Sequence, residues 1–157
     1  MHILIVNPNS TTEMTTRMAA QLVDELPGHV HLTQRTNHDG PPSIQGEADG
    51  DAAVPGTLSV LRETPFYMAI IGCFDDTGLD EARAEHGGRV IGIGDACYRR
   101  AAELNARFAV LTTSPLSVPV LKQNVERSGF DPICTGVFAS NVPVLEFESA
   151  RETRESW

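Results

Sequence analysis

The sequence has few of the features that commit a chain to a membrane, a nucleic acid or an anionic surface. Its 157 residues contain no apolar run near the roughly 20 residues that a transmembrane helix needs. Basic residues are scarce beside acidic ones, 12 against 21, and the formal net charge is -9. Because nucleic acids and anionic membranes repel an acidic protein, we expect neither as a partner.

Cysteine is scarce as well, with Cys73, Cys97 and Cys134 far apart in the chain. Their odd number and wide spacing argue against a disulfide framework and form no C-x-x-C motif. The histidines show no metal-ligand spacing, so we expect no metal. No signal peptide precedes the first apolar run, and we expect a cytoplasmic protein with reduced thiols. A phosphate-loop motif is missing, and Gly92-Ile93-Gly94 lacks the third glycine of a dinucleotide-binding motif.

What the sequence contains is an alternation of short apolar runs with amphipathic segments. The runs expected as strands are 2–6, 29–35, 67–71, 89–93, 108–111 and 133–138, and the segments expected as helices are 13–26, 57–63, 79–85, 94–105 and 118–128. This alternation predicts an α/β fold, a parallel sheet with helices on both faces. Residues 36–56 hold glycines, prolines and acidic residues and are expected to form a long loop.

Four loops leave the carboxyl ends of expected strands, at residues 7–12, 73–78, 92–95 and 112–115. In a parallel sheet such loops share one edge, so we expect them to gather around one site. They supply a thiol, amides, hydroxyls and helix N-terminal N–H groups, which suit a carboxylate or another small polar ligand.

Cys73 follows a strand-like run and precedes Asp75 and Asp76. From the residues alone it is either a buried thiol at a strand end, which is the commoner case, or a reactive one. The two carboxylates would raise the pKa of the thiol, whereas a helix N-terminus aimed at the sulfur would lower it. The aspartates could also cap the following helix with their charges turned away from the sulfur. Cys97 and Cys134 are expected to be packing residues.

A series of motifs, taken in order, resembles one family. The motifs are Ile3-Leu4-Ile5-Val6-Asn7-Pro8-Asn9-Ser10, Gly40-Pro41-Pro42-Ser43-Ile44, Gly72-Cys73-Phe74-Asp75-Asp76-Thr77-Gly78-Leu79-Asp80, Gly92-Ile93-Gly94-Asp95-Ala96 and Val110-Leu111-Thr112-Thr113. Over residues 2–146 the chain is similar to the Asp/Glu/hydantoin racemase family, in its hydantoin and allantoin branch. The resemblance implies two α/β lobes with the site between them. Residues 1–95 would form the first lobe, 96–145 an incomplete second lobe and 146–157 an atypical charged tail. We therefore expect a truncated, frame-shifted or fragmentary chain.

The family resemblance also implies a cofactor-independent racemase for hydantoin, allantoin or a similar carbonyl compound. In this family one thiolate removes the α-proton and a second thiol returns a proton to the opposite face. Cys73 matches the first thiol, and neither Cys97 nor Cys134 matches the second. The residues expected to bind substrate are Asn9, Ser10, Asp75, Asp76, Thr112 and Thr113. Thr77 stands where the family commonly has proline.

The unmatched second cysteine keeps two alternatives open. The chain could be an inactive or ligand-binding remnant, or a single-cysteine, decarboxylase-like enzyme that protonates one face of an enolate. An incomplete second lobe would expose a sheet edge and apolar surface, so we also expect homo-oligomers.

Overall fold

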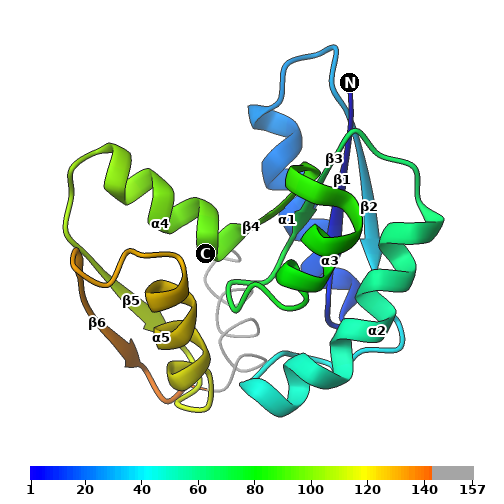
Figure 1. The fold of residues 1–157 in the computed structure, drawn as a ribbon. Coiled ribbons are helices and arrows are strands. Elements are labelled where there is room, and N and C mark those ends of the chain that lie inside the picture. Colours follow the sequence, from blue (N-terminus) through cyan, green and yellow to red (C-terminus); the bar gives the residue numbers. More distant parts are fainter. Residues whose placement is uncertain (143–157) are drawn as a thin grey trace, which may run out of the picture.

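The computed structural model describes residues 1–142, which form two parallel sheets connected through one helix (Figure 1). The first sheet has the strand order β2-β1-β3-β4 and consists of β1 (His2–Asn7), β2 (His31–Thr36), β3 (Met68–Ile71) and β4 (Val90–Gly92). The second sheet pairs β5 (Phe108–Thr112) with β6 (Cys134–Ala139). Every pair of neighbouring strands is parallel, which confirms the predicted α/β class.

Helices cover both faces of the first sheet. Helix α1 (Thr12–Glu25) lies on one face, and α2 (Glu47–Glu63) and α3 (Leu79–His86) lie on the other (Figure 1). Side chains alternate between the two faces of a strand, so Leu4 and Val6 of β1 both point into the core under α2 and α3. The remaining buried members of this core are Leu58, Leu61, Ala69, Ile71, Leu79, Ala82 and Val90.

The second sheet has a smaller core of its own. Helix α4 (Ile93–Glu103) follows β4 directly and leads to β5, and α5 (Ser117–Arg127) connects β5 to β6 (Figure 1). Tyr98 of α4 is buried there among Val110, Leu121 and Val125. The predicted boundary between residues 95 and 96 falls within α4 and stays a prediction. The predicted tail, 146–157, lies outside the described residues.

The prediction of a loop over residues 36–56 is wrong in its second half, because α2 begins at Glu47. Gly50 and Pro55 argue against a helix by propensity, yet both lie inside it. Glu47 and Asp49 in the first turn favour the helix N-terminus by charge, and Asp49 Oδ2 accepts the N–H of Gln45 at 2.9 Å. Tertiary packing of the apolar face of α2 on the sheet therefore overrides local propensity.

None of the helices within residues 1–142 has the length and apolar composition to span a bilayer.

Candidate functional site

Three of the four predicted site loops gather at one edge of the first sheet. Strands β1, β3 and β4 are parallel neighbours, so the loops after Asn7 and Ile71 and the start of α4 lie at the same edge. The loop expected over residues 92–95 is instead the end of β4 and the first turn of α4. The expectation that residues 112–115 share this edge is wrong, because β5 belongs to the separate sheet.

Helix α5 contacts the Cys73 loop instead. Ser117 Oγ donates to Asp75 Oδ2 at 2.8 Å, and Asn124 Nδ2 donates to the Asp75 carbonyl at 2.8 Å.

Cys73 lies just beyond β3 and packs its half-buried side chain against the core under α2 and α3. The Thr77 hydroxyl donates a hydrogen bond to Cys73 Sγ at 3.5 Å. Burial raises the pKa of the Cys73 thiol to about 12, and the nearby charge of Asp75 adds to this rise. The Thr77 hydroxyl and the Asp75 backbone N–H act in the opposite direction. At neutral pH Cys73 therefore rests as a protonated thiol.

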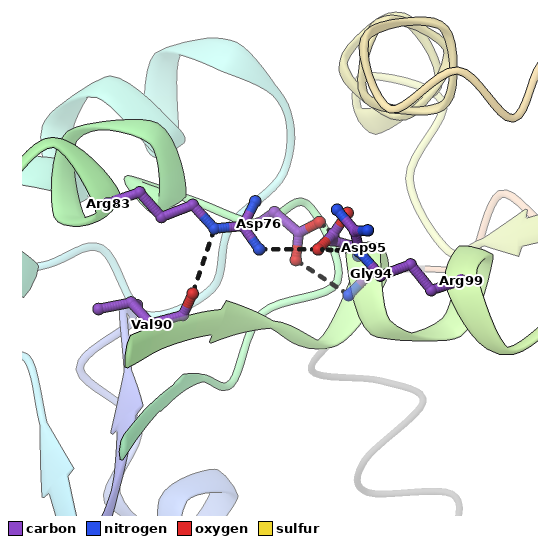
Figure 2. Close-up of polar contacts among 6 residues, drawn as sticks. All are labelled: Asp76, Arg83, Val90, Gly94, Asp95 and Arg99. Carbon is purple, nitrogen blue, oxygen red and sulfur yellow. Dashed lines mark hydrogen bonds and ion pairs between the residues drawn. The ribbon is translucent and has the colours of Figure 1, made fainter. Parts of the chain in front are cut away.

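Asp76 is buried and joins the Cys73 loop to the start of α4 (Figure 2). Its Oδ1 accepts the N–H of Gly94 at 2.9 Å and its Oδ2 accepts the N–H of Asp95 at 2.7 Å. These N–H groups have no partner inside the helix, so the carboxylate serves as the cap of α4. Burial raises the pKa of Asp76 to about 6 in spite of these two bonds.

The expectation that the two aspartates cap the following helix is wrong, because Asp76 caps α4 instead and Asp75 accepts a bond from Ser117. The N-cap of α3 is Gly78, which has a positive φ of 75° and no side-chain hydrogen bond. The carboxylate of Asp76 instead reaches α4, which is distant in sequence. Both carboxylate oxygens of Asp76 are engaged there, and its predicted role in binding substrate stays a prediction.

The close approach of Asp76 explains the glycines of the Gly92-Ile93-Gly94 motif. A Cβ placed on Gly92 would collide with Asp76 Oδ1. A Cβ on Gly94 would lie 2.5 Å from the Phe74 carbonyl oxygen and 2.7 Å from Asp76 Oδ2. The motif therefore lets the Cys73 loop lie directly against the α4 N-terminus.

Two arginines hold the neighbouring Asp95 (Figure 2). Asp95 Oδ2 accepts hydrogen bonds from Arg83 Nη2 of α3 at 2.7 Å and from Arg99 Nε of α4 at 2.9 Å. Burial alone would raise the pKa of Asp95, but the hydrogen bonds from Arg99 and Arg83 lower it overall. Arg83 Nε also donates to the Val90 carbonyl at 3.1 Å. The start of α4 is thus fixed to both α3 and β4.

Asp75 faces the second sheet rather than α4. Its carboxylate is partly buried, which raises its pKa, while the hydrogen bonds from Ser117 and from the Gly46 backbone lower it. Gly46 itself adopts a φ of 93°, and a Cβ there would lie 2.6 Å from the Leu116 carbonyl oxygen. Three segments of the chain therefore meet at Asp75, namely the Cys73 loop, the start of α2 and the start of α5.

The predicted binding residues Asn9 and Ser10 lie in a loop with extensive internal hydrogen bonds. Asn9 is buried, and its Oδ1 accepts bonds from Asn7 Nδ2 and from the Thr11 N–H, both at 2.9 Å. The Ser10 N–H donates to the Pro41 carbonyl at 2.9 Å. The segment around Pro41 is thereby attached to the loop after β1, and the side chain of Ser10 remains only half-buried.

Sequence reasoning missed Asn37, which holds these loops together. Asn37 is 1% exposed, and its Nδ2 donates to the carbonyls of Pro8 and Ala53 at 2.9 and 3.0 Å. Its Oδ1 accepts the N–H of Asp39 at 3.2 Å. The available signal was its position directly after β2, which matches that of the buried Asn7 at the end of β1.

Thr112 and Thr113 are half-buried at the end of β5, and the Thr112 carbonyl accepts the N–H of Ser140 at 2.8 Å. A cavity of about 160 Å³ separates the start of α2 from α5, and Asp75, Asp76 and Thr77 line one side of it. Neither Cys73 nor Asn9 lines this cavity. Within residues 1–142 no group of three histidine, cysteine, aspartate or glutamate side chains is arranged to hold a metal.

The sequence profile described as Asp/Glu/Hydantoin racemase matches residues 3–156, nearly the whole chain. The chain belongs to the Asp/Glu/hydantoin racemase family. It is 37% identical to the hydantoin racemase of Rhizobium meliloti over 158 residues, which cover 99% of this chain and 66% of that protein. It is 27% identical to the hydantoin racemase of Pseudomonas sp. (strain NS671), over 94% of this chain and 61% of that protein.

Solved structures of allantoin racemases share the fold. The allantoin racemase from Pseudomonas fluorescens superposes with a TM-score of 0.90 at 25% identity, over 96% of this chain and 65% of that one. The allantoin racemase from Klebsiella pneumoniae gives a TM-score of 0.90 at 29% identity, over 99% of this chain and 65% of that one. The chain thus spans between 61% and 66% of the length of these four proteins. The expected family and the predicted racemase-like α/β fold are confirmed.

Proposed function

We propose that this chain carries the Cys73 half of a cofactor-independent racemase site for a hydantoin, allantoin or similar cyclic carbonyl compound. The observation that carries the proposal is the placement of Cys73. It follows β3 at the edge shared with the β1 loop and the start of α4, and its sulfur accepts a hydrogen bond from Thr77. Membership of the racemase family supports a proton-transfer role for such a thiol.

The protonated state of the Cys73 thiol fits the step in which a proton is given to the substrate. With its pKa raised to about 12, Cys73 holds its proton at neutral pH and can give it to the α-carbon of an enolate. The S–H bond breaks, a C–H bond forms, and the sulfur becomes a thiolate. In the opposite direction the thiolate takes the α-proton, and the electron pair of the C–H bond moves onto the adjacent carbonyl as an enolate. A thiolate of raised pKa is the stronger base for this second step.

The groups around the thiol define what substrate the site would accept. Ser10 lies on the neighbouring β1 loop with a half-buried hydroxyl, which suits a carboxylate or ring carbonyl. The Asn9 amide is engaged within that loop, so its proposed binding role rests on the family resemblance. The proposed binding roles of Asp75, Asp76, Thr112 and Thr113 rest on the family resemblance. All three thiols of the chain are free, as acid/base chemistry requires, and this fits the cytoplasmic location expected from the sequence.

A single-thiol reaction is the second candidate, and the positions of the other cysteines favour it. Cys97 is exposed on α4, and Cys134 Sγ lies 3.6 Å from the Gly136 carbonyl in β6. Cys97 thus belongs to a helix and Cys134 to a strand, and neither lies in a loop beside Cys73. One thiol is enough to exchange an α-proton or to protonate an enolate on one face.

Exchange of the α-proton with solvent tests the role of Cys73. Single enantiomers of allantoin and 5-methylhydantoin are incubated in D₂O with the parent or the Cys73→Ser variant, and the α-proton signal is followed by NMR. Because the serine hydroxyl is a far weaker acid/base group, we expect exchange to fall by about 100-fold or more. The Cys97→Ser variant is the matched control and should keep the parent rate.

Optical rotation measured on the same samples separates the candidates. Exchange with loss of rotation indicates a racemase, and exchange with rotation retained indicates a single-thiol reaction. A parent that exchanges no faster than the enzyme-free blank but binds the substrate in calorimetry would support the ligand-binding alternative. Equal exchange in Cys73→Ser and parent would reject the proposed role.

A further inference from the structure

We propose that the Thr77 side chain is a dedicated hydrogen-bond donor to the Cys73 thiolate and thereby sets the reactivity of this sulfur. The catalytic meaning of this inference rests on the proposed function. The hydrogen bond itself is a property of the substrate-free protein, and it can be tested on the thiol alone.

The geometry of the turn holds the donor in place. Thr77 is 5% exposed, and its Oγ1 lies 3.5 Å from Cys73 Sγ. The Asp76 N–H donates to the Cys73 carbonyl and the Leu79 N–H donates to the Asp76 carbonyl, both at 3.0 Å. Between these two bonds Asp76 takes a φ of 52°, which turns the chain back so that Thr77 meets the sulfur.

The other end of the turn is fixed by α4. The Asp76 carboxylate is bound to the N–H groups of Gly94 and Asp95, so the turn cannot open without uncapping that helix. The buried Thr77 hydroxyl donates its hydrogen bond to Cys73 Sγ. Donation to sulfur is stronger when the sulfur is a thiolate than when it is a thiol, because hydrogen bonds to charged groups are stronger.

The surroundings of Cys73 disfavour a thiolate, and a hydrogen-bond donor to the sulfur opposes this effect. Burial disfavours a negative sulfur most, and the charges of Asp75 and Asp76 add to this effect. Two donors oppose them, the Asp75 backbone N–H and the Thr77 hydroxyl. Only the second belongs to a side chain, so it is the donor that a substitution can remove without changing the backbone. A proline at position 77 would supply no donor at all.

The pH dependence of alkylation at Cys73 tests the inference. Parent, Thr77→Val and Thr77→Ser proteins react with iodoacetamide between pH 7 and pH 11.5, and mass spectrometry of the peptide containing residue 73 gives the rate at that site. Valine keeps the shape but removes the hydroxyl. We expect Thr77→Val to raise the pKa of Cys73 by about one pH unit, which lowers the thiolate fraction at a given pH below it about tenfold. Alkylation should slow by about three- to fourfold, because a thiolate of higher pKa is also the better nucleophile. Thr77→Ser should retain the parent profile.

Thr57→Val is the matched control. Thr57 is also fully buried, and its hydroxyl donates to the Ala53 carbonyl within α2, away from the sulfur. This variant should lose comparable stability and leave the Cys73 profile unchanged. If Thr77→Val does not fold, Thr77→Ala is compared with Thr77→Ser in the same way.

An alkylation profile in Thr77→Val or Thr77→Ala that coincides with the parent would overturn the inference, as would an equal shift in Thr57→Val. This result is independent of whether Cys73 exchanges substrate protons. If the exchange experiment rejects the proposed function, the alkylation experiment still tests the Thr77 hydrogen bond. If the alkylation experiment rejects that hydrogen bond, the exchange experiment still tests the role of Cys73.

Discussion

Asp76 is the residue on which the Cys73 loop and α4 depend together. Its side chain caps α4, its backbone forms the turn that brings Thr77 to the sulfur, and Gly92 and Gly94 leave room for it. The Asp76 carboxylate accepts two N–H groups, which favour its charged form, and yet its pKa is raised. Desolvation outweighs the hydrogen bonds and the favourable charge of Arg83.

The raised pKa of Asp76 predicts a pH dependence of stability. A carboxyl group with a pKa of about 6 in the folded chain and about 4 in the unfolded chain stabilises the fold most below pH 4, and this contribution is lost as pH rises through 6. We expect the parent to gain free energy of unfolding relative to Asp76→Asn as pH falls from 7 to 4. Asparagine keeps the shape and tolerates the positive φ.

Urea unfolding of both proteins at pH 4.5, 5.5, 6.5 and 7.5 measures this difference. Carboxyl groups of lowered pKa, such as that of Asp95, change in the opposite direction but occur in both proteins, so the difference isolates Asp76. Unfolding free energies that run parallel for the two proteins over this range would contradict the prediction.

At the residue scale, the sequence could predict which residues carry chemistry but not what they touch. Cys73 was found from its place after a strand and from the family motif. Asp75 and Asp76 are adjacent and chemically identical, yet one faces Ser117 of α5 and the other caps α4. That division depends on the positive φ of Asp76, which turns the two side chains towards different elements, and no sequence pattern encodes it.

Helical glycines show how the same residue type has opposite roles in two elements. Gly50 lies in α2 with no atom within 4 Å of a Cβ placed on it, whereas a Cβ on Gly94 of α4 would lie 2.5 Å from the Phe74 carbonyl oxygen. Gly50 weakens its helix without a packing role. Gly94 also weakens its helix but permits the contact with the Cys73 loop.

Alanine substitutions at these two positions should therefore have opposite signs. We expect Gly50→Ala to stabilise the protein by about 0.5–1 kcal/mol, because alanine is the better helix former. Gly94→Ala should destabilise it by about 1–3 kcal/mol, because the added methyl forces the loop away from α4. Denaturant unfolding at constant pH measures both, and a Gly94→Ala variant as stable as the parent would refute the role given to this glycine.

Strands and most helices could be predicted because their apolar periodicity is local. The start of α2 could not, since Gly50 and Pro55 suggest a loop and only the packing of Ala53, Leu58 and Leu61 on the sheet outweighs them. Periodicity alone also puts β5 and β6 in one sheet with the other strands, and only the family resemblance indicated a second lobe. Parallel strands carry similar sequence patterns whichever sheet they join, so the assignment of β5 depends on long-range pairing alone.

At the scale of the whole molecule, the outer face of the second sheet stands out. Leu111 of β5 and Phe138 of β6 are paired in register, and they are 74% and 56% exposed. Their strand neighbours Val110 and Val137 point the other way, towards the core that includes Tyr98 and Leu121. Two large apolar side chains thus sit side by side on a surface that no described residue covers.

This surface predicts concentration-dependent self-association. We expect light scattering to give a mass that rises with protein concentration, and a double variant, Leu111→Thr with Phe138→Thr, to reduce this rise because it removes the apolar contact area. Val23→Thr is the control, since Val23 is 57% exposed on α1, far from the second sheet in the chain. Equal association of the parent and the double variant would show that another surface is responsible.

The strand order also sets the sequence in which the chain can fold. Strand β1 is made first but pairs with β2 on one side and with β3, more than sixty residues later, on the other. During synthesis the side of β1 that will bind β3 stays unpaired until residue 71 has left the ribosome, and such distant parallel pairings form slowly. The turn that holds Cys73 needs α4 as well, so its thiol reaches its final surroundings only after the first sheet is complete.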